Sequence, residues 1–136
     1  MPVALDMNHA MIYSKNVAKS AAFYQDKLGF ELLEEYRGGL IVVYARLRVP
    51  GSSSTLALHM IEREKELRIG GVRLYFEVKS LAGYCKKLAK SGVVFSKPPA
   101  LMPWGWRHAY LDNPDGHEIS LYTAGAKRLK KAKGLQ

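Results

Sequence analysis

The sequence predicts an α+β fold made of two tandem β-α-β-β-β modules, and three observations carry this prediction. Strand-like and helix-like segments recur in the same order in both halves, with an offset of about 60 residues. Each half holds one apolar stripe at helical spacing that stops at a glycine, Gly29 in the first half and Gly92 in the second. The turn sequence N-P-D-G at 113–116 joins two alternating arms, which is typical of a β-hairpin.

The first half begins with a strand and then a helix over 17–28, for which Asn16 is the expected N-cap. Gly38 and Gly39 mark a tight turn between two later strands. The strands of this half are expected at 8–14, 30–36, 40–48 and 55–61.

The second half repeats this order. A strand over 72–78 leads to Ser80, the expected N-cap of a helix that stops at Gly92. Residues 93–95 are expected to start a strand, and the P-P-A-L-M-P-W-G stretch is expected to be a loop. The hairpin that starts at Trp106 completes the half.

Length and charge bound the organisation of the chain. The 136 residues suit one domain over 1–125, with modules at about 7–63 and 70–124. The net charge is +9, but five of the positive charges lie in the basic tail 126–136. No recognition helix or basic stripe inside the domain indicates a nucleic-acid partner.

The composition is that of a cytoplasmic globular protein. No apolar run approaches the roughly 18 residues that a membrane span needs. The first residues lack the features of a signal peptide. The one cysteine, Cys85, excludes an internal disulfide and lies on the apolar stripe of the second helix, so we expect an inert core residue.

Strand alternation divides the side chains into a helix-covered face and an open face, and two open faces side by side would enclose a cleft. The helix-covered side chains are expected to be Ala10, Ile12, Leu58, Met60, Leu74, Phe76, Ile119 and Leu121. The open-face side chains are expected to be His9, Met11, Ala57, His59, Arg73, Tyr75, Glu77, Glu118, Ser120 and Tyr122.

Three stretches resemble the vicinal oxygen chelate superfamily, which includes glyoxalase I, extradiol dioxygenases, and fosfomycin and bleomycin resistance proteins. They are N-H-A-M-I, A-F-Y-Q-D-K-L-G-F and N-P-D-G-H-E-I-S-L-Y, and they span nearly the whole chain. The resemblance implies an incomplete barrel around a central cleft, and a homodimer. It leaves function open, because this fold hosts isomerases, dioxygenases, transferases and binding proteins.

The resemblance also implies a four-residue metal site, which falls here on His9, His59, Arg73 and Ser120. Arg73 and Ser120 depart from the family's histidine and glutamate. A guanidinium about 4 Å from a divalent ion would repel it by roughly 8 kcal/mol at an effective dielectric of about 20. With Arg73 turned outward, His9, His59 and Glu118 would instead hold a divalent metal such as zinc, iron, nickel or manganese.

The favoured function is therefore the binding of a small anionic or aromatic molecule, with a degenerate metal site and no strongly implied cofactor. The residues expected to contact this molecule are Arg73, Tyr75, Trp104, Trp106, Ser120 and Tyr122. The alternative is a divalent-metal-dependent lyase, isomerase or extradiol-type dioxygenase acting on vicinal oxygens.

A third hypothesis is metal-independent acid–base catalysis. It uses Glu118 as the base, His59 as a proton shuttle and Arg73 to hold an oxyanion. The two remaining histidines are not expected to take part, since His108 should lie on the sheet surface and His117 in solvent.

Overall fold

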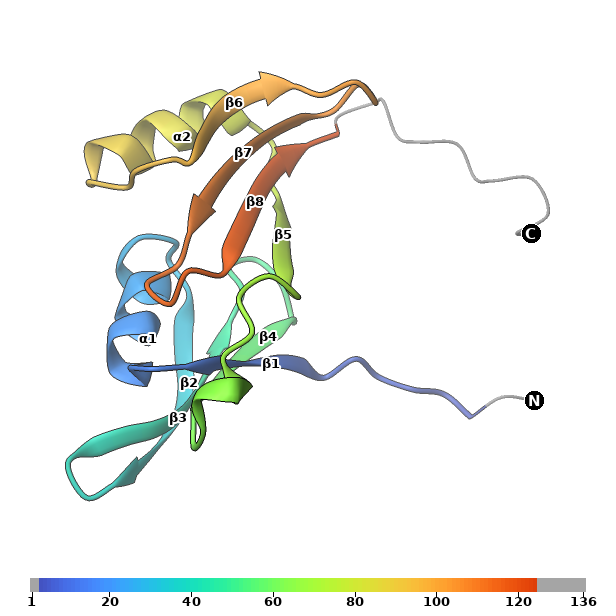
Figure 1. The fold of residues 1–136 in the computed structure, drawn as a ribbon. Coiled ribbons are helices and arrows are strands. Elements are labelled where there is room, and N and C mark those ends of the chain that lie inside the picture. Colours follow the sequence, from blue (N-terminus) through green and yellow to red (C-terminus); the bar gives the residue numbers. More distant parts are fainter. Residues whose placement is uncertain (1–2, 125–136) are drawn as a thin grey trace. The chain divides into compact units, whose positions relative to one another are not determined.

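The computed structural model describes residues 3–124, so the basic tail 126–136 lies outside the described residues. The chain forms two compact units (Figure 1). The first takes in the described residues up to Gly71 together with the turn Asn113–Gly116. The second takes in Val72–Asp112 and the described residues from His117 onward. The single-domain organisation over 1–125 stays a prediction.

The first unit is a four-stranded mixed sheet with one α-helix on it. The sheet order is β1-β4-β3-β2, in which β1 and β4 are parallel and the other pairs are antiparallel. The helix α1 packs on β2, β3 and β4. The elements are β1 (His9–Ser14), α1 (Val17–Asp26), β2 (Glu31–Gly38), β3 (Ile41–Arg48), β4 (Thr55–Met60) and the 3-10 helix η1 (Glu64–Glu66).

The start of α1 follows from its sequence. The Asn16 side chain accepts a hydrogen bond from the Lys19 backbone N–H at 3.0 Å, which satisfies one of the unpaired donors at the helix start. The helix ends at Asp26, two residues before the expected end at Leu28, and Gly29 turns the chain with a positive φ of 74°.

The second unit repeats the first. Its sheet order is β5-β8-β7-β6, again with one parallel pair, β5 and β8. The helix α2 packs on β6, β7 and β8. The prediction of an α+β fold with two β-α-β-β-β modules is confirmed, and the strands form two separate four-stranded sheets. The elements are β5 (Arg73–Glu77), α2 (Leu81–Lys90), β6 (Lys97–Leu101), β7 (Arg107–Asp112) and β8 (Glu118–Thr123).

The position of β6 differs from the prediction. Residues 93–95 are not a strand, and β6 instead runs through the part of the P-P-A-L stretch that was expected to be a loop. Pro98 and Pro99 are tolerated because β6 is the last strand of its sheet, and its pairing with β7 is irregular between Lys97 and Ala100.

The N-P-D-G turn is held by α1 and by Lys15, two residues before the start of this helix. Asp115 accepts hydrogen bonds from the Lys15 backbone N–H at 2.8 Å and from the Ser20 hydroxyl at 2.6 Å. The Asn113 amide donates to the Tyr24 hydroxyl at 3.0 Å. Burial raises the pKa of Tyr24 to about 12. The turn is thus a fixed part of the first unit.

Cys85 and His117 are both buried, which was expected for the cysteine and not for the histidine. Cys85 is buried on α2 as expected, and burial raises the pKa of its thiol, which keeps it unreactive. The expectation that His117 is exposed is wrong, since its exposed fraction is only 2%. The turn before it is held by hydrogen bonds and does not project into solvent.

No helix in the described part of the chain has the length and apolar character required to span a membrane.

Candidate functional site

The helix-covered faces are as expected for Ile12, Leu58, Ile119 and Leu121, which are all buried. The candidate site residues therefore lie on the opposite, open face of each sheet, because neighbouring residues of a strand point to opposite sides. The predicted cleft between the two modules stays a prediction.

The first unit does not bring its two candidate metal ligands together. His9 on β1 pairs with Thr55 on β4, whereas His59 pairs with Tyr13. The two histidines are therefore offset by four residues along parallel strands, on the order of 13 Å. One ion cannot be bound by both side chains at that separation.

Each of these histidines has its own local partner. The His9 Nδ1 lies 2.7 Å from the Asn8 side-chain oxygen. The His59 Nδ1 lies 2.8 Å from the Met60 carbonyl oxygen, and its ring meets that of Tyr13 edge-on at 6.1 Å.

In the second unit, the Arg73 side chain lies on the open face and contacts other side chains of that face, so it is not turned away from them as a metal site at Glu118 would require. Arg73 on β5 forms an ion pair with Glu118, its register partner on β8. Its guanidinium also donates to the Tyr75 hydroxyl at 3.2 Å and lies 5.5 Å from the centre of the Tyr110 ring. The hydrogen bond to Tyr75 raises the pKa of Arg73 further, so the cation is permanent.

The side chains at the family's metal positions do not fit a divalent ion. In the second unit Arg73 is a cation, Glu118 is already paired with it, and the buried Ser120 hydroxyl is bonded to His108 at 2.7 Å. Within residues 3–124, no group of three His, Cys, Asp or Glu side chains is placed to hold a metal.

The open face of the second unit carries a set of touching rings, here called the aromatic cluster. His108 is at its centre, stacked on Tyr122 with ring centroids 5.2 Å apart and on Tyr110 at 5.8 Å. Trp106 stacks on Tyr122 at 5.4 Å. The rings of Tyr75 and Trp104 stand nearly perpendicular to His108. The cluster consists of Tyr75, Trp104, Trp106, His108, Tyr110 and Tyr122.

The placement of His108 corrects the expectation of a sheet-surface residue. Its exposed fraction is 2%, and its Nδ1 bonds the Ser120 hydroxyl. Burial, and to a lesser degree the positive charge of Arg73, lowers the pKa of His108, so the ring is neutral at physiological pH.

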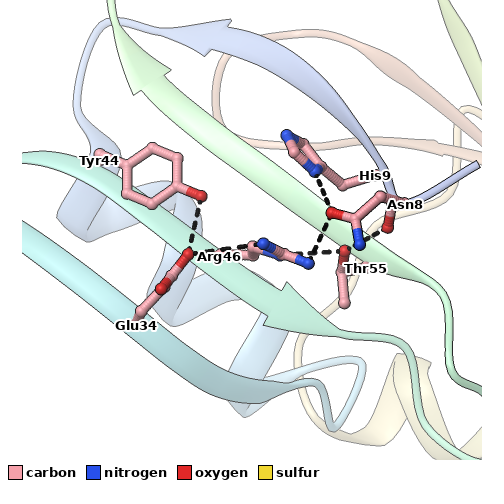
Figure 2. A network of polar contacts seen from close by, with 6 residues as sticks. All are labelled: Asn8, His9, Glu34, Tyr44, Arg46 and Thr55. Atoms are coloured by element: carbon pink, nitrogen blue, oxygen red, sulfur yellow. Dashed lines mark hydrogen bonds and ion pairs between the residues drawn. The ribbon is translucent and has the colours of Figure 1, made fainter.

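The open face of the first unit carries hydrogen bonds where the second carries rings (Figure 2). At its centre, Arg46 on β3 donates to the Asn8 side-chain oxygen at 2.8 Å and to the Thr55 hydroxyl at 3.2 Å. Arg46 also lies 3.6 Å from Glu34, which accepts from the Tyr44 hydroxyl at 3.1 Å. The residues of this polar network are Asn8, His9, Glu34, Tyr44, Arg46 and Thr55.

The sequence analysis does not include Tyr110 and Arg46 among the candidate residues and assigns His108 to the sheet surface, although a usable signal exists for all three. His108 is the register partner of Tyr122, and Arg46 that of Ala57, so each shares the face of a residue already expected there. Alternation was applied only to the first and last strand of each module, and these three residues lie on the middle strands.

The fold and the two open faces define a small α+β protein of paired β-α-β-β-β units. The family model described as Glyoxalase/Bleomycin resistance protein/Dioxygenase superfamily matches residues 6–121. The chain belongs to this superfamily, as its resemblance to vicinal oxygen chelate proteins implied.

Several solved structures are similar. A member of this superfamily from Sphaerobacter thermophilus DSM 20745 is 26% identical with a TM-score of 0.72, covering 89% of this chain and 98% of that one. TnmS3, an antibiotic binding protein from Streptomyces sp. CB03234, is 24% identical with a TM-score of 0.72, covering 90% and 98%. A Nocardioides member is 22% identical with a TM-score of 0.74, covering 97% and 93%. No curated protein matches the sequence.

Proposed function

We propose that the protein binds a small planar aromatic molecule that carries a negative charge or oxygen acceptors, at the open face of the second unit and without a metal. The observation that carries this proposal is the aromatic cluster, which leaves two large rings partly in water beside an arginine. The exposed fraction is 52% for Tyr75 and 44% for Trp104.

Exposed rings beside a stacked layer favour a flat ligand. Offset stacking and edge-to-face contacts between rings are worth about 0.5–1.5 kcal/mol beyond the area that they bury. A ligand ring that covers Tyr75 or Trp104 would also remove apolar surface from water. Contiguous exposed apolar surface of this kind is typical of a binding site.

Arg73 supplies the polar part of the site. A guanidinium has five N–H donors in a planar fork, more than Tyr75 and Glu118 take up. Glu118 balances the charge of Arg73, so recognition of an anion would rest on these directed donors and not on a net positive field. Trp106, Ser120 and Tyr122 belong to the same face and would position the rings that contact the ligand.

Small-molecule binding is compatible with the fold, since a solved protein of this fold is described as antibiotic binding. The likeness adds the fold alone, and the ligand class follows from the side chains of the second unit.

Tryptophan fluorescence tests the proposal directly, because both tryptophans of the chain, Trp104 and Trp106, belong to the aromatic cluster. Titration with a panel of aromatic carboxylates and phosphates is expected to change the emission in a saturable way. An Arg73→Met substitution should weaken binding of the carboxylates about ten-fold, because a charge-assisted hydrogen bond is lost.

The matched control is Arg107→Met, an exposed arginine at the start of β7 that should leave the affinity unchanged. A panel in which no compound alters the emission would refute the proposal.

A further inference from the structure

Among residues 3–124, one ring nitrogen of His108 has no hydrogen-bond partner. Its Nδ1 lies 2.7 Å from the Ser120 hydroxyl oxygen. Its Nε2 is buried and has no hydrogen-bond partner among residues 3–124. A buried polar atom without a partner is rare in native proteins, and a ligand that pairs with it on binding is one explanation for it.

The hydrogen bond to Ser120 indicates which ring nitrogen carries the proton. In the described part of the chain, the only hydrogen-bond partner of the buried Ser120 hydroxyl is the His108 side chain. If Nδ1 donated to this hydroxyl, the serine hydrogen and Nε2 would both lack a partner. If the hydroxyl donates to Nδ1, only the Nε2–H is left, which is the less costly arrangement.

Two neighbouring hydroxyls are already taken up by other partners in the described part of the chain. The hydroxyl of Tyr75 accepts from Arg73, and the hydroxyl of Tyr122 is directed to Glu77 at 3.5 Å. The faces of the His108 ring are covered by Tyr110 and Tyr122. The two rings that stand across it, Tyr75 and Trp104, are the most exposed of the aromatic cluster and are the ones that a ligand can displace.

We infer that the Nε2–H of His108 is a specificity-determining donor for an oxygen acceptor on the ligand's aromatic ring, either a phenolate oxygen or the oxygen of a carbonyl or carboxylate group bonded to the ring. The inference rests on the proposed function and narrows it. Binding moves one of Trp104 and Tyr75 aside, the ligand ring packs against the other, and the oxygen accepts from Nε2. Planar molecules without an acceptor leave this buried donor unpaired, so they bind more weakly than ligands that carry an oxygen acceptor. Ser120 acts as a positioning residue, since its hydroxyl holds the ring in the tautomer that donates from Nε2.

The first test is nuclear magnetic resonance of the wild-type protein, using long-range correlations between the ring protons and nitrogens of histidine. His108 is expected to carry its proton on Nε2 in the free protein. Addition of 2-naphthoate should shift the Nε2 resonance, and addition of indole, whose polar group is only a donor, should shift it much less. A proton on Nδ1, or equal shifts with both compounds, would overturn the inference.

The second test is calorimetric titration of the same two compounds into the wild type and His108→Phe. Phenylalanine keeps a ring on the cluster and removes the donor. The affinity for 2-naphthoate should fall about ten-fold, while that for indole should change less than about two-fold. An equal effect on both compounds, or no effect on either, would contradict a role for His108 in specificity.

The two compounds also separate this inference from the proposed function. If neither binds the wild type at any concentration tested, the aromatic site itself is refuted. If both bind and His108→Phe does not distinguish them, the aromatic site stands and the role of His108 is refuted. The wild-type resonance experiment decides the tautomer even if the variant folds poorly.

Discussion

The open faces of the two units are built on the same sheet order but filled with opposite chemistry. The first unit places an arginine, Arg46, among hydrogen-bonding partners, and the second surrounds a neutral histidine, His108, with rings. Each face also holds an arginine close to a glutamate, Arg46 with Glu34 and Arg73 with Glu118. The repeated backbone arrangement therefore determines which positions share an open face, whereas the residue types at those positions determine the chemistry of that face.

The polar network and the aromatic cluster should also contribute differently to the free energy of unfolding. The polar network is solvent-accessible and exchanges hydrogen bonds with water, so each of its bonds adds little to stability. The aromatic cluster buries its central ring, and removing that ring leaves a hole and an unpaired serine. Substitution at the two centres should therefore cost different amounts.

The largest effect is expected for His108→Ala. The free energy of unfolding should fall by about 3 kcal/mol, because a buried ring is lost and the Ser120 hydroxyl loses its partner. Urea unfolding followed by circular dichroism measures this change. Arg107→Ala, exposed on the same strand, is the control and should cost less than about 0.5 kcal/mol. A loss below about 1 kcal/mol for His108→Ala would mean that the ring is not part of a packed layer.

A smaller effect is expected for Arg46→Ala at the centre of the polar network. The loss should be about 1–1.5 kcal/mol, since hydrogen bonds to Asn8 and Thr55 disappear but water replaces them in part. Arg48→Ala is the matched control, because Arg48 on the same strand forms only an exposed ion pair with Glu31. The same urea measurement applies, and equal losses for Arg46 and Arg48 would show that the network adds nothing.

The smallest expected effect is a dependence of stability on pH. It should come from His108 at the centre of the second unit's open face, whereas Arg46, at the centre of the first, does not titrate. Burial and Arg73 hold the pKa of His108 below the ordinary value of about 6.5. The unfolded chain therefore binds a proton where the folded one does not, so this contribution is present above about pH 6.5 and is lost as the pH falls. The other charged groups on this face are Lys97, over the Tyr110 ring, and the carboxylates Glu77 and Glu118.

The comparison of wild type with His108→Phe isolates this term. When the pH is lowered from about 7.5 to about 5.5, the free energy of unfolding should decrease more for the wild type than for the variant. Parallel losses in the two proteins would show that His108 is not the group that titrates.

Local signals in the sequence were enough for most of the fold. Asn16 caps α1, Gly29 turns the chain with a positive φ, and apolar alternation places Ile119 and Leu121 in the core. The position of β6 was missed because two prolines normally argue against a strand, and only its place at the sheet edge makes them acceptable.

The candidate site was less predictable, because it depends on register between strands. Arg73 and Glu118 were both expected on one face, but their pairing comes from β5 and β8 being aligned at those residues. His9 and His59 were matched by their place in the repeat, but the regular parallel pairing of β1 with β4 sets them four residues apart along the strands. The burial of His108 depends on rings from three other segments, which no local pattern contains.

The two prolines of β6 have a consequence for self-association. An outermost strand normally offers a row of N–H and C=O groups onto which another chain can add a strand, the first step toward aggregation. Pro98 and Pro99 have no N–H, and Lys97 beside them adds a charge, so this edge of the sheet is a poor template for such growth. A homodimer, which the superfamily leads us to expect, would therefore have to form through side-chain packing or another edge, without extending the sheet at β6.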